Sequence, residues 1–167
     1  MPYWTGSTYD RQSRRAIEAG PTGSDLDNYL VSRQLVEATS DVSDGHWTTQ
    51  SGAATNLFAV VDETPFPIDT DYAQSYFSSV PDSFVLAVDP TLLGPVAGNQ
   101  YLRYRYGKDA VGGHRVDLTV ALLQSGVSIQ TWVHQDIPAG FVQVAQLVTV
   151  SITSYGALSA RFTYQQV

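Results

Sequence analysis

Hydrophobic and polar residues alternate along two segments in the second half of the chain. Segment 102–106 places its apolar side chains on one face of a strand, and places Arg103 and Arg105 on the other. Segment 116–120 alternates in the same way, and the turn-rich segment 108–113 separates the two. The apolar residues of the first segment are Leu102, Tyr104 and Tyr106. A period of two residues predicts the centre of an antiparallel sheet.

Short runs of this kind recur from Asp41 onward, separated by Gly, Pro, Asn and Asp. Ser125 and Gly126 give the clearest hairpin turn, because glycine tolerates a positive φ and the flanking residues can pair. Strands are expected near Trp47 and at 57–62, 72–77, 83–88, 100–106, 115–123, 127–134, 141–150 and 158–165. This pattern predicts an all-β fold, an antiparallel β-sandwich or jelly roll, over residues 43–167.

Residues 1–42 differ from this pattern and are interpreted as an N-terminal arm. Ser24 or Asp25 could cap a short helix that extends to Val36. Such a helix is marginal by itself, so the arm could pack on its own β domain, reach a neighbouring subunit or stay disordered. The candidate partner-binding residues in the arm are Arg11, Arg14, Arg15, Leu26, Tyr29 and Leu30.

The composition fits one globular domain. The chain has 167 residues, of which 43% are hydrophobic and 15% charged. Its net charge is −7, and acidic residues exceed basic ones in both parts, which argues against nucleic acid as a partner. Cysteine is absent, so disulfides and thiolate metal sites are excluded. Without a signal sequence or a long apolar run, we expect synthesis in the cytoplasm and no integral membrane segment.

The three histidines give no sign of catalysis. His46, His114 and His134 are far apart in sequence and lack the spacing of a metal site or a nucleophilic triad. We expect the first two in loops and the third at the end of a strand, where its ring can bond a turn. The chain is therefore predicted to be neither an enzyme nor a cofactor-binding protein.

The acidic segment 61–72 is the one candidate cation site. Carboxylates at irregular spacing can hold Ca²⁺, although this segment does not match the calcium loop of helix–loop–helix proteins. The alternatives are a solvated loop whose side chains cap turns and a pair of glycosidase carboxylates. The weak calcium candidates are Asp62, Glu63, Asp69 and Asp71.

Aromatic and arginine side chains offer two further hypotheses. Some aromatic residues could form a platform that stacks on sugars, although such residues more often belong to a core. Arg103 and Arg105 could pair with Asp117 across the sheet, reach carboxylates of a partner, or form a solvated ladder. The aromatic candidates are Trp47, Tyr101, Trp132, Phe141, Tyr155 and Tyr164.

The β region contains two longer motifs, SDVSDGHWTTQSG at 40–52 and LRYRYGKDAVGG at 102–113. Shorter motifs lie at 57–64, 69–72, 115–120 and 158–167. Together they resemble a family of small virion structural proteins of tailed bacteriophages and prophages, over roughly residues 40–167. The N-terminal region departs from the family because it is longer and has its own helix signal.

The resemblance implies a jelly-roll or galactose-binding-like sandwich with a structural role in the virion. We expect a head decoration protein on the capsid surface, with the major capsid protein and other virion proteins as partners. The oligomeric state stays open and includes a homo-oligomer. The alternative is a tail or head-fibre module that binds host glycans through exposed aromatic residues.

Overall fold

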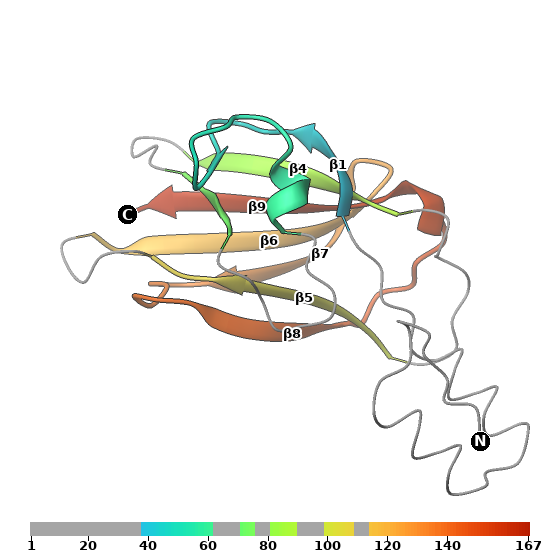
Figure 1. The fold of residues 1–167 in the computed structure, drawn as a ribbon. Helices are drawn as coiled ribbons and strands as arrows, with labels where there is room; N and C mark the ends of the chain where they lie inside the picture. The colour runs from blue at the N-terminus through green and yellow to red at the C-terminus, as the bar shows by residue number, and fades with distance from the viewer. Residues whose placement is uncertain (1–37, 62–70, 76–80, 90–98, 109–113) are drawn as a thin grey trace, which may run out of the picture.

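The computed structural model describes residues 38–61, 71–75, 81–89, 99–108 and 114–167 (Figure 1). Strands dominate these residues, which confirms the all-β prediction for this part of the chain. The strands are β1 (Ala38–Ser43), β2 (Thr48–Thr49), β3 (Ala73–Gln74), β4 (Asp82–Val88), β5 (Gln100–Tyr106), β6 (Val116–Gln124), β7 (Val127–His134), β8 (Val142–Val148) and β9 (Leu158–Gln166). The two 3₁₀ helices are η1 (Leu57–Val60) and η2 (Tyr155–Ala157).

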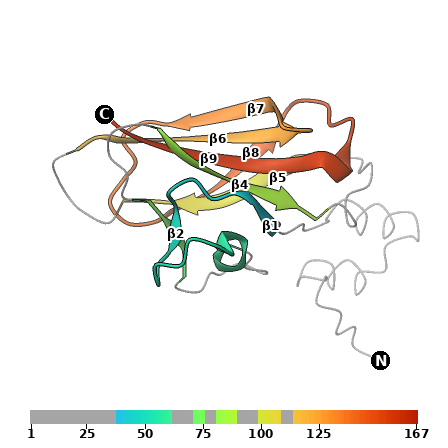
Figure 2. The same ribbon diagram turned by 90° about the horizontal axis from the view of Figure 1, so that it is seen from above.

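The described strands form one large antiparallel sheet and two small ones. The large sheet has the order β1-β4-β9-β6-β7, and the small sheets pair β5 with β8 and β2 with β3. Figure 2 shows β5 and β8 as a second layer beside the large sheet. The last strand, β9, lies between β4 and β6, so the C-terminal residues hold the two halves of the large sheet together.

The two alternating segments that open the sequence analysis lie in different sheets. Strand β5 pairs with β8, whereas β6 pairs with β7 and β9. The prediction that both segments form the centre of one sheet is therefore wrong. A period of two residues shows that each strand has a buried face, but it is the same whether two strands pair side by side or face each other across a core.

Two apolar clusters fill the space on the inner face of the large sheet. The first joins β5 to β6 through Tyr104 and Val120, and the second joins β4 to η1 through Phe84 and Leu57. Phe162 of β9 packs against both clusters, and its ring lies 5.0 Å from that of Phe84 and 5.7 Å from that of Tyr104. The core is therefore continuous across the sheet.

The hairpin between β6 and β7 forms at Ser125 and Gly126, as predicted. Both residues have positive φ angles, 51° and 78°. Gln124 opposes Val127 in the register, so the turn contains two residues. Two consecutive positive φ angles are typical of the type I′ turn, whose twist matches that of paired strands.

Segment 57–62 was expected to form a strand, but its first part is the 3₁₀ helix η1. The carboxylate of Asp41 in β1 accepts hydrogen bonds from the backbone N–H groups of Leu57 at 2.9 Å and of Phe58 at 2.8 Å. These N–H groups begin the helix and would otherwise lack acceptors. A carboxylate from a distant strand thus caps η1, which a local pattern cannot reveal.

Two glutamines fasten the connection from β8 to β9. The amide of Gln130 accepts a hydrogen bond from Thr149 N–H at 2.8 Å and donates one to the Leu147 carbonyl at 3.0 Å. The Gln124 Oε1 atom accepts from the N–H groups of Thr153 and Ser154 at 2.8 and 3.0 Å. Side chains from β6 and β7 of the large sheet therefore bind the backbone that connects β8 of the small sheet to β9.

Strand β1 begins at Ala38, within the segment assigned to the arm, and pairs with β4. The helix expected between residues 24 and 36 lies outside the described residues.

The core position of Val120 gives a direct test of the register. Val120 is 0% exposed and Val127 is 67% exposed. We expect Val120→Asp to abolish folding, because an unpaired buried carboxylate costs several kcal/mol out of a total stability of about 5–15 kcal/mol. Val127→Asp, which adds the same charge at the surface, should melt like the wild type by circular dichroism. A normal melting transition for Val120→Asp would show that the assigned inner face is wrong.

Candidate functional site

The β5–β8 sheet turns one face to the core and the other to solvent. Alternate residues of the two strands form its solvent side, and Phe141, which directly precedes β8, extends it. Tyr101 and Phe141 are 50% and 54% exposed, which is high for aromatic side chains. The opposed pairs on this side are Tyr101 with Leu147, Arg103 with Ala145 and Arg105 with Gln143. We call these residues and Phe141 the outer face of the small sheet.

Arg105 is held in place at one end of this face. Its guanidinium carbon lies 4.5 Å from the centroid of the Phe141 ring, a cation–π contact. Its Nη2 atom donates a hydrogen bond to the backbone carbonyl of Asp71 at 3.1 Å. The Tyr72 ring lies 5.6 Å from the Phe141 ring and supports it. The planar guanidinium therefore has a defined position before any partner arrives.

Arg103 is exposed at the middle of the outer face. Within the described residues, no hydrogen bond or ion pair engages its guanidinium. Its opposed residue on β8 is Ala145, which has a short side chain without a polar group. The sequence analysis did not single out Ala145 or Leu147, because pairing of β5 with β8 joins segments about 40 residues apart and has no local signal.

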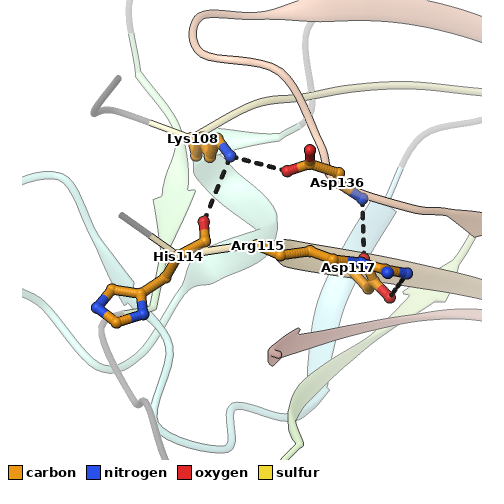
Figure 3. Close-up of polar contacts among 5 residues, drawn as sticks. All are labelled: Lys108, His114, Arg115, Asp117 and Asp136. Atoms are coloured by element: carbon orange, nitrogen blue, oxygen red, sulfur yellow. Dashed lines mark hydrogen bonds and ion pairs between the residues drawn. The ribbon is translucent and has the colours of Figure 1, made fainter. Parts of the chain in front are cut away.

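Other charged residues gather where β5 ends and β6 begins (Figure 3). Lys108 Nζ lies 3.0 Å from Asp136 Oδ1, and Arg115 donates two hydrogen bonds of 2.9 Å to Asp117. The two hydrogen bonds from Arg115, together with one from the backbone N–H of Asp136, hold the pKa of the Asp117 carboxyl below its usual value. Asp117 therefore pairs with Arg115, and its predicted pairing with Arg103 or Arg105 is wrong because β5 and β6 lie in different sheets.

His134 forms a partly buried polar group with two tyrosines at the margin of the core. Its Nε2 lies 2.7 Å from the Tyr104 hydroxyl and its Nδ1 lies 2.9 Å from the Tyr106 hydroxyl. A neutral imidazole has one donor and one acceptor nitrogen, so one hydroxyl donates to the ring and the other accepts from it. Burial lowers the pKa of His134 and raises that of Tyr104, which favours the neutral form of both. The arrangement fixes β7 against β5.

The other histidines lie in loops, as predicted. His46 follows β1, and its ring Nδ1 lies 3.2 Å from a carboxylate oxygen of Asp82, which is buried. His114 precedes β6, and its ring points away from the ion pairs in Figure 3. The ring of His134 bonds tyrosine hydroxyls rather than a turn, and this corrects the prediction for that residue.

The residues predicted for partner and calcium binding are mostly outside the described part of the chain. Among the calcium candidates only Asp71 is described, and its backbone carbonyl binds Arg105. The described residues include no group of three or more His, Asp or Glu side chains placed to hold a metal ion. The candidates outside the described residues are Arg11, Arg14, Arg15, Leu26, Tyr29, Leu30, Asp62, Glu63 and Asp69.

The six aromatic candidates divide into two groups. Tyr101 and Phe141 are exposed, and both belong to the outer face of the small sheet. The others are only partly exposed: Trp47 contacts the Phe84 ring at 4.5 Å, and Trp132 packs against the core. Tyr155 and Tyr164 are half-buried. The exposed aromatic residues therefore share their face with Arg103 and Arg105.

Comparison with models of known protein families, with characterised proteins and with solved structures finds no match to this chain. Among the described residues, neither 3₁₀ helix has the length or apolarity needed to cross a membrane.

The His134 group predicts a loss of stability in mild acid. The pKa of His134 is lowered in the folded chain, so below about pH 6.5 the unfolded chain binds more protons and unfolding becomes easier. We expect the free energy of unfolding to be constant above that pH and to fall as the pH decreases through the folded-state pKa. Urea unfolding at a series of pH values measures this dependence.

The variant His134→Gln keeps a donor and an acceptor but does not titrate, so its stability should depend less on pH. His114→Gln, at an exposed position, should retain the wild-type dependence. Equal pH dependence in the wild type and His134→Gln would contradict the assignment.

Proposed function

We propose that this chain is a structural protein of a tailed-bacteriophage virion, and that it is a head decoration protein which binds the lattice of the major capsid protein. The proposal comes from the motifs between residues 40 and 167. One structural observation supports it: one face of the small sheet carries the exposed aromatic residues Tyr101 and Phe141 together with the exposed Arg103. Exposed apolar residues that gather on one surface often belong to a protein interface.

The layered arrangement suits this role, and we assign it to the jelly-roll type of sandwich. Strand β8 belongs to the small sheet, whereas the next strand, β9, lies in the large sheet between β4 and β6. Such pairing over long sequence distances gives a rigid body with a solvent-facing sheet surface. A rigid surface loses little conformational entropy when it binds a lattice of identical sites.

Stabilisation of the shell follows from mass action. A protein that binds the assembled shell and not its free subunits shifts the equilibrium towards the shell, by an amount that grows with its concentration above the dissociation constant. Contacts with two adjacent capsomers, or association into a homo-oligomer, would raise the apparent affinity further. In this proposal the protein is located on the capsid surface, and other virion proteins are additional partners.

A tail or head-fibre module that binds host glycans is the second candidate. The exposure of Tyr101 and Phe141 favours it, because aromatic rings at a surface can stack on sugar rings. This function requires few copies in each particle and saturable binding of sugars. The two candidates therefore differ in copy number.

The decisive experiment is to count the copies in purified virions by quantitative mass spectrometry, with the major capsid protein as the internal reference. Decoration predicts one copy per capsid subunit or a simple lattice fraction of it. A handful of copies per particle would contradict decoration and favour the tail or fibre role. Absence of the chain from virions would contradict both.

The arm gives a separate prediction. We expect simultaneous replacement of Arg11, Arg14 and Arg15 by Gln to lower occupancy on shells several-fold, because exposed ion pairs contribute up to about 1 kcal/mol each. Co-sedimentation of the full chain with shells that lack it measures this occupancy. The melting temperature should not change, and that is the control for folding. Unchanged occupancy would contradict a role of these arginines in attachment.

A further inference from the structure

Strand β7 forms a free edge of the large sheet. It is the last strand in the order β1-β4-β9-β6-β7, and its only partner in the sheet is β6 (Figure 2). Within the described residues, no backbone hydrogen bond is made on its other side. An edge strand presents a row of unpaired N–H and C=O groups, with which another extended strand can pair.

The two edges of the large sheet differ in how they are protected from such pairing. Strand β1, at the opposite edge, contains Asp41, has two register shifts in its pairing with β4, and is bound to η1. Charged residues, irregular pairing and covering elements are the features that keep an edge unpaired. Strand β7 contains no Asp, Glu, Lys, Arg or Pro, and its one register shift lies opposite Leu122 and Leu123. The run 130–134 is therefore a regular and uncharged edge.

The side chains beside this edge favour a second copy of the chain as its partner. Val133 is 59% exposed, and Thr131 is exposed on the same face. Their opposed residues on β6 are Thr119 and Ala121, which are also uncharged. Because the whole chain has a net charge of −7, two copies repel each other wherever their acidic surfaces meet. The edge at β7 is a place where two copies can approach without that repulsion.

The sequence of β7 fits antiparallel pairing with itself. Trp132 is the centre of the regular run, so a twofold axis beside it places Thr131 of each copy opposite Val133 of the other. Both residues are β-branched, and such residues pack well as cross-strand neighbours. An interface that uses the same edge in both copies closes on itself, so association stops at the dimer.

We propose that two copies of this chain associate through β7, in an antiparallel pairing that joins their large sheets into one continuous sheet. The inference rests on the geometry and charge of β7, independently of the role proposed in the virion. Each copy contributes one strand, so the interface is small and the free dimer is reversible. On a capsid, such a dimer would present two shell-binding surfaces at once and raise the apparent affinity.

Sedimentation equilibrium of the full chain tests the dimer directly. We expect the average mass to rise from that of one chain in micromolar solution towards twice that value in millimolar solution, with no larger species. Over the same range, NMR of the isotopically labelled chain should show concentration-dependent shifts of amide signals in β7. Added salt should strengthen the association, because it screens the repulsion between two acidic copies.

Two variants with the same change in charge, one at each edge of the large sheet, make the test specific. Val133→Lys should weaken dimerisation about tenfold, because a charge at the paired edge is unfavourable and is present twice in a symmetric dimer. Val42→Lys, on β1 and at a position that is 62% exposed, should leave dimerisation unchanged. Both positions are at the surface, so both variants should melt like the wild type in dilute solution.

A chain that stays monomeric up to millimolar concentration would overturn the inference, and the edge would then be open to an extended segment of another protein. Association with signal shifts at other strands, or equal association of Val133→Lys and the wild type, would overturn it as well. Dimers as expected with few copies in virions would contradict decoration and leave this inference standing. Many copies in virions of a chain that stays monomeric in solution would do the reverse.

Discussion

The ring of Phe162 is the contact on which the rest of the structure depends. It stacks on Phe84 at 5.0 Å with 14° between the planes, and it forms a T-shaped pair with Tyr104 at 5.7 Å and 82°. Through these two rings it joins the cluster under η1 to the cluster between the two sheets. Because β9 is the last strand, these contacts form only when the C-terminal residues have joined β4 and β5. Folding of the two halves is therefore coupled.

The same packing determines what the molecule shows to solvent. Tyr104 and Tyr106 are fixed on the inside by the core and by hydrogen bonds to His134. Since successive side chains of a strand point in opposite directions, Arg103 and Arg105 must then point outward. An ordered inner face thus produces an ordered outer face, and Phe141 adds a direct contact that holds Arg105. Positions held in this way reduce the entropy lost on binding.

Local patterns predicted much of the fold and little of the surface. The hairpin at Ser125 and Gly126 and the two faces of β5 follow from turn chemistry and alternation, which act between neighbours in sequence. The helix η1 does not, because Asp41 caps it from another strand. Pairing of β5 with β8 likewise depends on contacts across the core, so the sequence named Arg103 and Arg105 but could not place Ala145 opposite the first of them. Residues predicted in the arm lie outside the described structure, and their roles stay predictions.

The position of charges follows the same division between local and long-range causes. Arg115 and Asp117 are two residues apart on one strand, so they can pair without help from the rest of the fold. Arg103 and Arg105 have the same separation, but both are cations, and β8 offers them only Ala145 and Gln143 as opposed residues. Arg105 is engaged instead from outside the two strands, by the Phe141 ring and by the backbone carbonyl of Asp71. The position of Arg105 is thus set by long-range contacts, whereas that of Arg115 follows from a neighbour on its own strand.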